Sequence, residues 1–548
     1  MTVFADTLVA RRDSWAAMCQ AFEWPVLDRF NMASACVERW ARQDPQRTAL
    51  ICLKDGKPPE DVSYQRLNLL SNQFANVLTA GGFQPTDRCA ILLQQSLETA
   101  VCQFGTYKVA GVALPLFTLF GADALEFRLR DSGAKVLVTD SANLPKVLEV
   151  IDQLPDLKTV FCIDGAGPQA GGIQIRDFHR DLAAASDVFQ TKATTPDDPA
   201  LLVYTSGTTG PPKGALHGHR VLIGHLPCVE MAHNFFPHAG DLQWTPADWA
   251  WMGGLMNTLM PSLYYGVPVV AYRMGKFDPH RVYDLIETHS IRNAFLPPTA
   301  LKLMRQIPAP GATTLRSVLS GGEALGADIL DWGRKGLGLT INEIYGQTEC
   351  NLVLGNSVRV FAPKPGSMGL PNPGANVVVL GEDGEVLEPE NTGEIAIHRS
   401  HMGMFLGYWN NPEKTAAKFR GDWLLTGDIG ETDTEGFFRF SSRDDDVISS
   451  AGYRVGPTEI ETCLSSHPDV IFAGVIGIPD DIRGEVVKAF VVLREGAFHD
   501  GLIAELIDLV KQRVSPHVAP RSIQILDEMP MTATSKIMRR ELRALHKG

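Results

Sequence analysis

The sequence lacks the features of several protein classes. Its nine cysteines include no C-x-x-C pair and are odd in number, which argues against a zinc site of ordinary spacing and against a disulfide framework. It has no basic excess, because 63 acidic residues outnumber 50 basic ones and give a net charge of −13. A nucleic-acid-binding protein needs clustered cations to neutralise phosphates. We therefore expect reduced thiols and no nucleic-acid partner.

Long apolar runs are absent as well. Residues 1–15 contain no apolar segment of the length that a signal peptide requires. The most apolar stretch, 255–272, is interrupted by Asn257, Pro261, Gly266 and Pro268, so it is predicted to be buried core and not a membrane span. The sequence thus predicts a cytoplasmic protein without a membrane span. It leaves the oligomeric state open, a homodimer included.

The length and the alternation of patterns predict a multidomain α/β protein. A chain of 548 residues with 45% hydrophobic content is too long for one ordinary core. Short apolar runs alternate with helical periodicity in the first 150 residues, which is typical of parallel sheets covered by helices. The expected elements there are a helix at 64–81, a strand at 88–93, a helix at 97–110 and a strand at 135–139.

The pattern of predicted strands and helices changes twice further along the sequence. From about Asn376 short strands alternate with Gly-rich or acidic turns, which indicates a β-rich subdomain; these strands are 377–380, 393–397 and 436–440. A smaller α/β segment follows Arg443, with helices at 457–465 and 501–514 and strands at 470–476 and 486–493. We predict a large N-terminal domain (1–442), made of parallel-sheet α/β subdomains plus the β-rich subdomain. A small, mobile α+β C-terminal domain (443–548) completes the chain.

One loop has the composition of a phosphate-binding site. Residues 204–214 read YTSGTTGPPKG and follow the apolar run 200–203. Glycines allow close backbone approach, and backbone N–H groups, hydroxyls and a lysine can hold polyphosphate oxygens. The loop is not a Walker A motif, because prolines precede the lysine and glycine follows it. The candidate residues are Thr205, Ser206, Gly207, Thr208, Thr209, Gly210 and Lys213.

This string resembles the signature loop of the adenylate-forming superfamily: acyl-CoA synthetases, luciferases and peptide-synthetase adenylation domains. Further segments resemble that family's motifs in the same order, namely Gly321-Gly322-Glu323, the YGQTE segment Tyr345–Glu349, Thr426-Gly427-Asp428 and Arg443. The resemblance implies ATP and Mg²⁺ as cofactors. It implies that Gly322 and Glu323 line the adenine side and that Tyr345, in a segment with Gly346 and Gln347, stacks on adenine. It implies further that Thr348 meets the α-phosphate and that Glu349 holds Mg²⁺. Asp428 and Arg443 would contact the ribose.

The C-terminal segment extends the resemblance. Lys536 lies in PMTATSKIMRR, similar to the family's catalytic-lysine motif PKTxxGKIxRxxL, although Ser535 and Met531 replace its usual glycine and lysine. Asp445 matches the hinge residue about which the two domains rotate. Segments 450–461 and 483–493 resemble those of medium-chain acyl-CoA synthetases, which implies coenzyme A as acceptor, with Gly452 along the pantetheine tunnel and Arg454 near its mouth.

The chemistry explains why such a set is needed. A carboxylate must attack the α-phosphorus of ATP, and two negative charges 4 Å apart repel by roughly 4 kcal/mol at a partly screened dielectric. The site must therefore supply cations, and we expect Lys536 and the Mg²⁺ on Glu349 to do so, with Thr348 as a third catalytic residue. No covalent enzyme intermediate is required.

The acyl pocket is expected to accept more than acetate. In acetate-specific relatives a tryptophan occupies the position of Gly346, and larger side chains occupy those of Gly253 and Gly321, so three glycines imply room. Trp251 and Met252 are the expected lining. We expect an AMP-forming acyl-CoA synthetase for a medium-chain fatty acid. The alternatives are an aryl-CoA ligase of the benzoate or cinnamate type, an adenylation domain that loads a carrier protein, and a non-catalytic nucleotide-binding relative.

Overall fold

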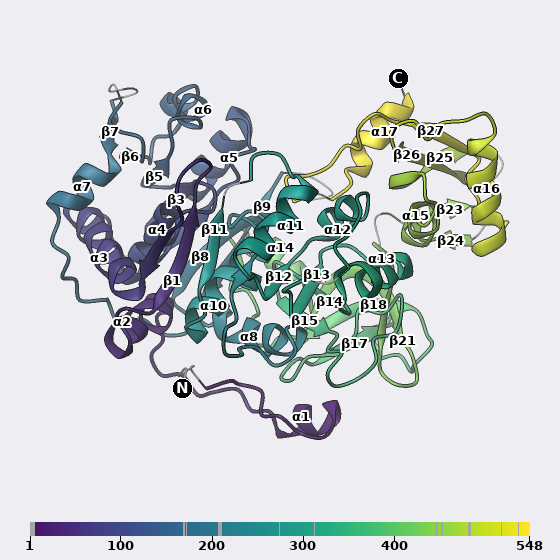
Figure 1. Ribbon diagram of the computed structural model, residues 1–548, viewed down its shortest axis with the longest axis horizontal. Helices are drawn as coiled ribbons and strands as arrows, with labels where there is room; N and C mark the ends of the chain where they lie inside the picture. Colours follow the sequence, from purple (N-terminus) through teal and green to yellow (C-terminus); the bar gives the residue numbers. More distant parts are fainter. Residues whose placement is uncertain are drawn as a thin grey trace.

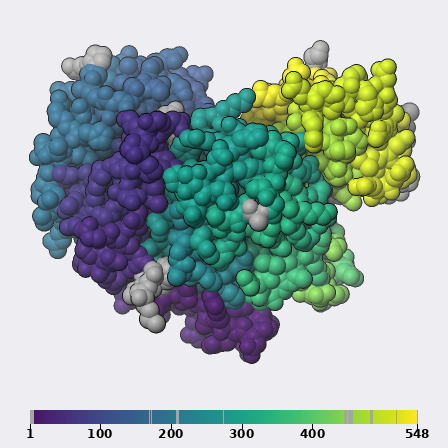
Figure 2. Space-filling model, in the orientation of Figure 1, coloured from purple at the N-terminus to yellow at the C-terminus, as the bar shows by residue number. Residues whose placement is uncertain are grey.

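The computed structural model describes residues 6–547 except 168, 169, 171, 206–210, 273, 312, 444, 445, 447, 451, 452, 481–483, 517 and 535. A large domain, coloured purple to green, carries a smaller C-terminal domain in yellow (Figure 1). In the space-filling view the yellow residues lie against the teal middle of the chain (Figure 2). This arrangement matches the expected α/β fold with a large N-terminal and a small C-terminal domain.

Among the described residues, the first sheet of the large domain has eight strands. Its central strands are parallel, and β3, β4 and β5 are buried almost throughout, which explains their continuous apolar sequences. The hairpin of β8 and β9 is antiparallel. In spatial order the strands are β19 (Gly407–Tyr408), β9 (Lys213–Gly218), β8 (Pro199–Thr205), β4 (Val112–Pro115), β3 (Arg88–Leu92), β5 (Val136–Thr139), β6 (Thr159–Cys162) and β7 (Gln174–Asp177).

In the part of the chain that the structure describes, the second sheet has nine strands and is parallel from β1 to β14 through its centre. Antiparallel strands close both of its edges. In spatial order they are β16 (Leu370–Pro371), β15 (Asn351–Gly355), β14 (Asn342–Gln347), β13 (Ser317–Gly321), β12 (Asn293–Phe295), β10 (Gln243–Trp244), β11 (Val269–Tyr272), β1 (Thr48–Leu53) and β2 (Glu60–Ser63).

Two five-stranded sheets follow in the sequence. The first is antiparallel and is made of β17 (Val377–Leu380), β18 (Gly393–His398), β20 (Phe419–Arg420), β21 (Trp423–Thr432) and β22 (Phe438–Arg443). The second belongs to the C-terminal domain and is made of β23 (Ile448–Ser450), β24 (Tyr453–Val455), β25 (Val470–Asp480), β26 (Gly484–Leu493) and β27 (Ser522–Ile525). The last strand of one sheet thus ends at Arg443 and the first strand of the next begins at Ile448.

Helices cover the sheets. The largest core cluster combines residues of α3, α4 and α8 with residues of β1, β3 and β11, so these helices join the two large sheets. The helices of the large domain are α1 (Trp15–Ala21), α2 (Arg39–Gln43), α3 (Tyr64–Ala80), α4 (Leu97–Lys108), α5 (Ala122–Ser132), α6 (Leu144–Leu148), α7 (Phe178–Ala184), α8 (Val221–Ala232), α9 (Met252–Gly254), α10 (Met260–Tyr265), α11 (Pro279–Thr288), α12 (Pro298–Met304), α13 (Ala327–Trp332) and α14 (Pro412–Ala417), and those of the C-terminal domain are α15 (Pro457–Ser465), α16 (Leu502–Arg513) and α17 (Arg539–Lys547). Shorter helical turns are η1 (Ser34–Glu38), η2 (Ile151–Gln153), η3 (Leu255–Leu259) and η4 (Gly333–Leu337).

The expected elements are largely confirmed. The helix predicted at 457–465 is α15 with the same bounds, and α3, β3 and α4 differ from their predicted bounds by one or two residues. The strand predicted at 436–440 is β22 and begins only at Phe438, because Gly436 turns with φ +85°. Short buried helices and β11 occupy 255–272, so this stretch is core. Among the described residues no helix is both long and apolar enough to cross a membrane.

Candidate active site

The nucleotide motifs meet where parallel strands of the second sheet end. β13 ends at Gly321 and β14 at Gln347, so the segments Gly321–Glu323 and Tyr345–Glu349 lie at the same carboxyl edge. In open α/β sheets this edge is where ligands bind. Side chains from the antiparallel sheet, on β21 and β22, reach the same place.

The carboxylate of Asp428 is the centre of this cluster. Its Oδ2 accepts hydrogen bonds from the Tyr345 hydroxyl and from Nε2 of Gln347, each at 2.6 Å. Its Oδ1 pairs with the Arg443 guanidinium at 2.9 Å. Two carboxylate oxygens offer about four acceptor positions, so sugar hydroxyls can share the group with these partners. Four residues expected at the nucleotide are thereby in mutual contact.

Local geometry presents Asp428 to the cluster. Asp428 and Arg443 are cross-strand neighbours on β21 and β22. Gly427 has φ +73°, which a side chain would disfavour, and its N–H donates to Oε1 of Glu394 at 2.7 Å. The Thr426 hydroxyl accepts from the Asp428 N–H at 3.0 Å. The Thr-Gly-Asp segment is therefore a bent strand whose carboxylate points at Tyr345.

Burial sets the protonation of the tyrosine. It raises the pKa of Tyr345 well above its ordinary value, and the negative charge of Asp428 raises it further. The phenol therefore remains a hydrogen-bond donor across the physiological pH range.

A second cluster surrounds Glu349. Its Oε1 accepts from the Tyr408 hydroxyl at 2.5 Å, and its backbone carbonyl accepts from Phe405 N–H at 2.7 Å. The Lys213 ammonium lies 5.2 Å from the centre of the Tyr408 ring. Burial, followed by the nearby cations Lys414 and Lys418, lowers the pKa of Lys213. A carboxylate and a partly desolvated cation are thus presented together at the end of the glycine-rich loop, where β9 begins.

Tyr408 is not among the residues expected at the site. It lies on β19, where it pairs with Ala215 of β9, and this pairing brings it beside Lys213 from nearly two hundred residues away. A Gly-Tyr-Trp run in a polar stretch is the only signal that the sequence offered.

The phosphate loop is described at its two ends. Thr205 closes β8, and its hydroxyl lies 3.4 Å from the carbonyl of Lys213. Residues Ser206, Gly207, Thr208, Thr209 and Gly210 lie outside the described residues. Thr348 is partly buried in the turn that follows β14.

The adenine-side segment contacts the rest of the site through side chains. Gly322 has φ +103°, and a Cβ there would lie 3.4 Å from the Trp251 ring. Glu323 pairs with Lys302 at 3.7 Å. Trp251 therefore packs directly over the backbone of this segment.

The C-terminal candidates are only partly described. Asp445, Gly452 and the side chain of Arg454 lie outside the described residues, although the backbone of Arg454 pairs with Ser449 in the hairpin of β23 and β24. Lys536 is exposed, and its N–H donates to the Thr532 hydroxyl at 3.1 Å. Among the described residues no hydrogen bond or ion pair holds its ammonium. In Figure 1 the segment leading into α17 extends from the C-terminal domain toward the large one.

The three pocket glycines do not leave open space. A Cβ on Gly346 would lie 1.8 Å from the carbonyl oxygen of Asn351, and one on Gly321 would lie 2.4 Å from that of Ile344. Gly253 differs from these two because its nearest neighbours are all side-chain atoms, with the Phe295 ring at 3.0 Å and Trp251 at 3.1 Å. The inference that missing side chains create room is thus wrong for Gly346 and Gly321, because close backbone approach already requires glycine there.

An apolar cluster nevertheless adjoins the nucleotide residues. Trp251 and Phe295 have ring centroids 5.4 Å apart, and Met252 is buried in the neighbouring core. The cluster contains Cys228, Ala232, Ala247, Phe295, Leu319 and Ile344, with Trp251 and Leu352 packed against it.

The donor set suits Mg²⁺. The described residues contain no group of three or more His, Cys, Asp or Glu side chains that could hold a metal ion by themselves. Mg²⁺ is typically held by one or two carboxylates together with substrate phosphates and water. A single buried carboxylate, Glu349, beside a phosphate loop fits that pattern.

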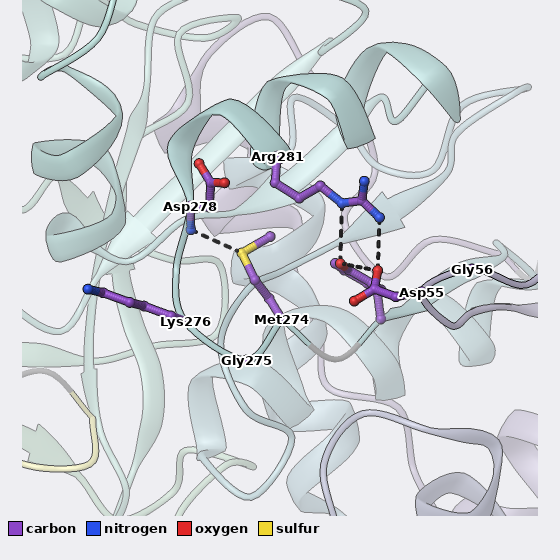
Figure 3. Close-up of a pocket in the computed structure, with 8 residues that line it drawn as sticks. Asp55, Gly56, Met274, Gly275, Lys276, Asp278 and Arg281 are labelled. Atoms are coloured by element: carbon purple, nitrogen blue, oxygen red, sulfur yellow. Dashed lines mark hydrogen bonds and ion pairs between the residues drawn. The ribbon is translucent and has the colours of Figure 1, made fainter.

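Two surface hollows lie elsewhere. One is lined by Asp55, Gly56, Tyr272, Met274, Gly275, Lys276, Asp278 and Arg281. In Figure 3 Arg281 lies beside Asp55. Its guanidinium donates to the Asp55 carboxylate and to the Tyr272 hydroxyl, so its charge is already paired. The other lies between β1 and helices α3, α4 and α7. Neither contains a residue of the nucleotide cluster.

Comparison with known proteins decides the family. The profile of the AMP-binding enzyme family matches residues 37–409, and the profile of the AMP-binding enzyme C-terminal domain matches residues 459–536. The chain belongs to this family. It is an enzyme of the AMP-forming acid–CoA ligase class, with ATP as its nucleotide.

Individual relatives span almost the whole chain. The acetyl-coenzyme A synthetase of Bacillus subtilis (strain 168) is 35% identical over 544 residues, 97% of this chain and 94% of that protein. The human mitochondrial acyl-coenzyme A synthetase ACSM4 is 34% identical over 534 residues, 95% of this chain and 91% of that protein. The crystal structure of the anthranilate CoA ligase AuaEII with anthranoyl-AMP has a TM-score of 0.87 at 26% identity, covering 95% of this chain and 98% of that one.

Proposed function

We propose that this AMP-forming ligase activates an apolar carboxylic acid larger than acetate, a medium-chain fatty acid in particular, and transfers its acyl group to coenzyme A. The observation that carries the proposal is the convergence of two clusters, Asp428 with Tyr345 and Arg443, and Glu349 with Lys213. The first suits a nucleoside and the second suits its phosphates. The similarity to ACSM4, an acyl-coenzyme A synthetase, supports transfer of an acyl group to coenzyme A.

The first half-reaction forms an acyl-adenylate. A carboxylate oxygen bonds to the α-phosphorus of ATP, the bond to the β-phosphate oxygen breaks, and pyrophosphate leaves. Asp428 and Arg443 orient the ribose, Lys213 and the loop hold the departing phosphates, and Lys536 contributes positive charge at the reacting centre. Mg²⁺ on Glu349, when bound, neutralises phosphate charge.

The second half-reaction forms the thioester. The sulfur of coenzyme A bonds to the acyl carbon, the bond to the AMP oxygen breaks, and the thiol proton is released. Gly452 lies along the proposed pantetheine tunnel and Arg454 at its mouth. We propose Asp445 as the hinge between residues 1–442 and 443–548, since Lys536 and pantetheine need the same approach to the acyl group in different steps.

An aromatic acid is the second candidate. The Trp251–Phe295 pair offers ring faces beside the nucleotide cluster, and aromatic groups favour offset or edge contacts with such rings. The similarity to an anthranilate CoA ligase points the same way. A fatty acid remains the first choice because aliphatic side chains, Ala232, Ala247 and Leu319, make up much of the cluster.

One assay separates these possibilities. AMP release is measured over a panel of acids (acetate, butyrate, hexanoate, octanoate, benzoate and anthranilate), with and without coenzyme A. Medium-chain preference with strict dependence of turnover on coenzyme A supports the proposal. Highest kcat/KM with acetate or an aromatic acid would overturn the proposed substrate. Turnover that occurs only with a carrier protein would overturn coenzyme A as the proposed acyl acceptor.

The cytoplasm is the proposed compartment. All nine cysteines are described and none is in a disulfide, which suits a reducing compartment. Cell fractionation, with detection by an antibody to the native protein, tests this proposal. Size-exclusion chromatography with light scattering tests the oligomeric state, for which a homodimer is the state to examine first.

A further inference from the structure

A buried side chain lies at the base of the turn that carries the expected phosphate-site residues Thr348 and Glu349. Residues Gln347–Asn351 connect β14 to the antiparallel β15 and contain Thr348 and Glu349, and Gln347 and Asn351 are register partners. Asn351 has φ +60° and is 2% exposed. Asparagine tolerates this left-handed conformation better than most residues. Its carboxamide is therefore enclosed at the base of the turn.

The Asn351 carboxamide joins three parts of the fold. Its Nδ2 donates to the carbonyl of Gly403 at 2.9 Å, and its Oδ1 lies 3.2 Å from Nδ1 of His225. His225 is a buried residue of α8, and its Nε2 lies 2.7 Å from the side chain of Asn257. The result is a continuous buried chain, Asn257–His225–Asn351–Gly403, directly beneath the turn.

These parts have no room to slide independently. A Cβ on Gly224 of α8 would lie 2.0 Å from Gly403 N, and one on Gly346 would lie 1.8 Å from the carbonyl of Asn351. Phe405 also donates its N–H to the Glu349 carbonyl at 2.7 Å. α8 thus touches the 401–405 segment through backbone, and that segment touches the turn in the same way, so the Asn351 side chain bonds the base of the turn to parts of the fold that are already packed together.

The protonation of His225 fixes the direction of the chain. Burial lowers its pKa to about 4, although the two carboxamides act in the opposite sense, so the ring is neutral and has one N–H. Gly403 holds the NH₂ group of Asn351, so Oδ1 of Asn351 faces the ring and the proton belongs on Nδ1. Nε2 then accepts, so Asn257, whose Oδ1 is the atom placed 2.7 Å from Nε2, must present its NH₂ group to the ring instead.

We propose that Asn351 and His225 are positioning residues for adenylate formation, holding Thr348 and Glu349 in place for the α-phosphate through the Asn257–His225–Asn351–Gly403 chain. This inference rests on the roles of Thr348 and Glu349 in the proposed function. Neither Asn351 nor His225 touches the reacting atoms. Their effect is on the geometry of the turn, so it falls on the adenylation rate more than on stability.

Two substitutions of His225 separate positioning from packing. An asparagine carboxamide reproduces the place of Nδ1, whereas a glutamine carboxamide reproduces that of Nε2. His225→Asn should therefore keep the bond to Asn351 and lose Asn257, and His225→Gln should do the reverse. Glutamine is the better helix former of the two, so a merely structural role for His225 predicts the opposite order of damage.

The measurement is ATP–pyrophosphate exchange with the preferred acid, together with thioester formation from supplied acyl-AMP. His225→Gln should lower the exchange kcat about tenfold, the equivalent of one hydrogen bond, while His225→Asn stays within about twofold to threefold of wild type. Asn351→Gly, which tolerates φ +60°, should match His225→Gln. Thioester formation should change less than exchange in all variants.

A buried asparagine on the neighbouring strand β14 is the matched control. Asn342 donates to the Ala232 carbonyl at 2.6 Å and does not contact the turn, so Asn342→Ala should lower the melting temperature but retain exchange. Equal exchange by the two His225 variants, or wild-type exchange by Asn351→Gly, would overturn the positioning role. The exchange rate of the wild type alone tests the proposed function, so the two failures are distinguishable.

Discussion

The Tyr345 hydroxyl donates a hydrogen bond of 2.6 Å to Oδ2 of Asp428, although the two residues are 83 positions apart in the sequence. The bond joins the YGQTE segment of the second sheet to the Thr-Gly-Asp bend of the antiparallel sheet. Arg443 pairs with Oδ1, the other oxygen of the same carboxylate. This junction is where the nucleoside is proposed to bind.

Removing the carboxylate should impair recognition of the ribose. Asp428→Ala is expected to raise the KM for ATP about tenfold or more, because hydrogen bonds to a charged group are lost. It should also reduce the preference for ATP over 2′,3′-dideoxy-ATP in pyrophosphate exchange. Tyr345→Phe, which retains the ring, should give a smaller effect. If Asp428→Ala distinguished the two nucleotides as wild type does, its ribose role would be wrong.

Lys536 should matter in one half-reaction only. Lys536→Ala is expected to lower pyrophosphate exchange about a hundredfold, as the loss of one electrostatic contact to a transition state does, while thioester formation from supplied acyl-AMP persists. The control is Lys511→Ala, which removes an exposed lysine paired with Asp508. Equal loss of both half-reactions in Lys536→Ala would contradict the assignment.

Gly452→Leu should show the reverse pattern. A side chain in the proposed pantetheine tunnel blocks the thiol but leaves ATP chemistry untouched, so exchange should persist while thioester formation falls about tenfold or more. The two half-reactions are measured separately, as for Lys536. Parallel behaviour of the Gly452 and Lys536 variants would contradict rotation about Asp445.

The glycines of the acyl site call for different tests. Gly346→Ala should destabilise the protein by about 1–3 kcal/mol, because its Cβ would collide with the Asn351 carbonyl; thermal unfolding measures this.

Gly253→Val presses instead on the rings of Phe295 and Trp251, and it should shift the substrate preference toward shorter acids. The control is Gly275→Ala, where a Cβ meets nothing within 4 Å. An unchanged chain-length profile in Gly253→Val would refute the pocket.

Glu343 should make stability depend on pH. Burial raises the pKa of Glu343 from 4.5 to about 8, partly offset by the hydrogen bond that it accepts from Leu325 N–H. Between these values the folded state binds the extra proton, so the free energy of unfolding falls as pH rises from about 4.5 to about 8. Glu343→Gln mimics the protonated form. Its melting temperature relative to wild type should rise over this range, and a constant difference would contradict the shift.

The sequence by itself determined the local elements and the order of the chemical motifs. Apolar spacing and capping residues act over a few neighbouring positions, so α15 was predicted with its observed bounds and α3 to within one residue. The motifs around Lys213, Tyr345 and Asp428 were also recognisable, because each depends on residue types that stand next to one another in the chain.

Only the tertiary structure decided which distant groups touch and how much space remains between them. Tyr408 reaches Glu349 through the pairing of β19 with β9, and Asn351 reaches His225 because α8 packs on β15. The space at Gly346 depended on the approach of Asn351 across a bulge between β14 and β15. Strand order, register and backbone separation set these contacts, and no spacing along the sequence encodes them directly.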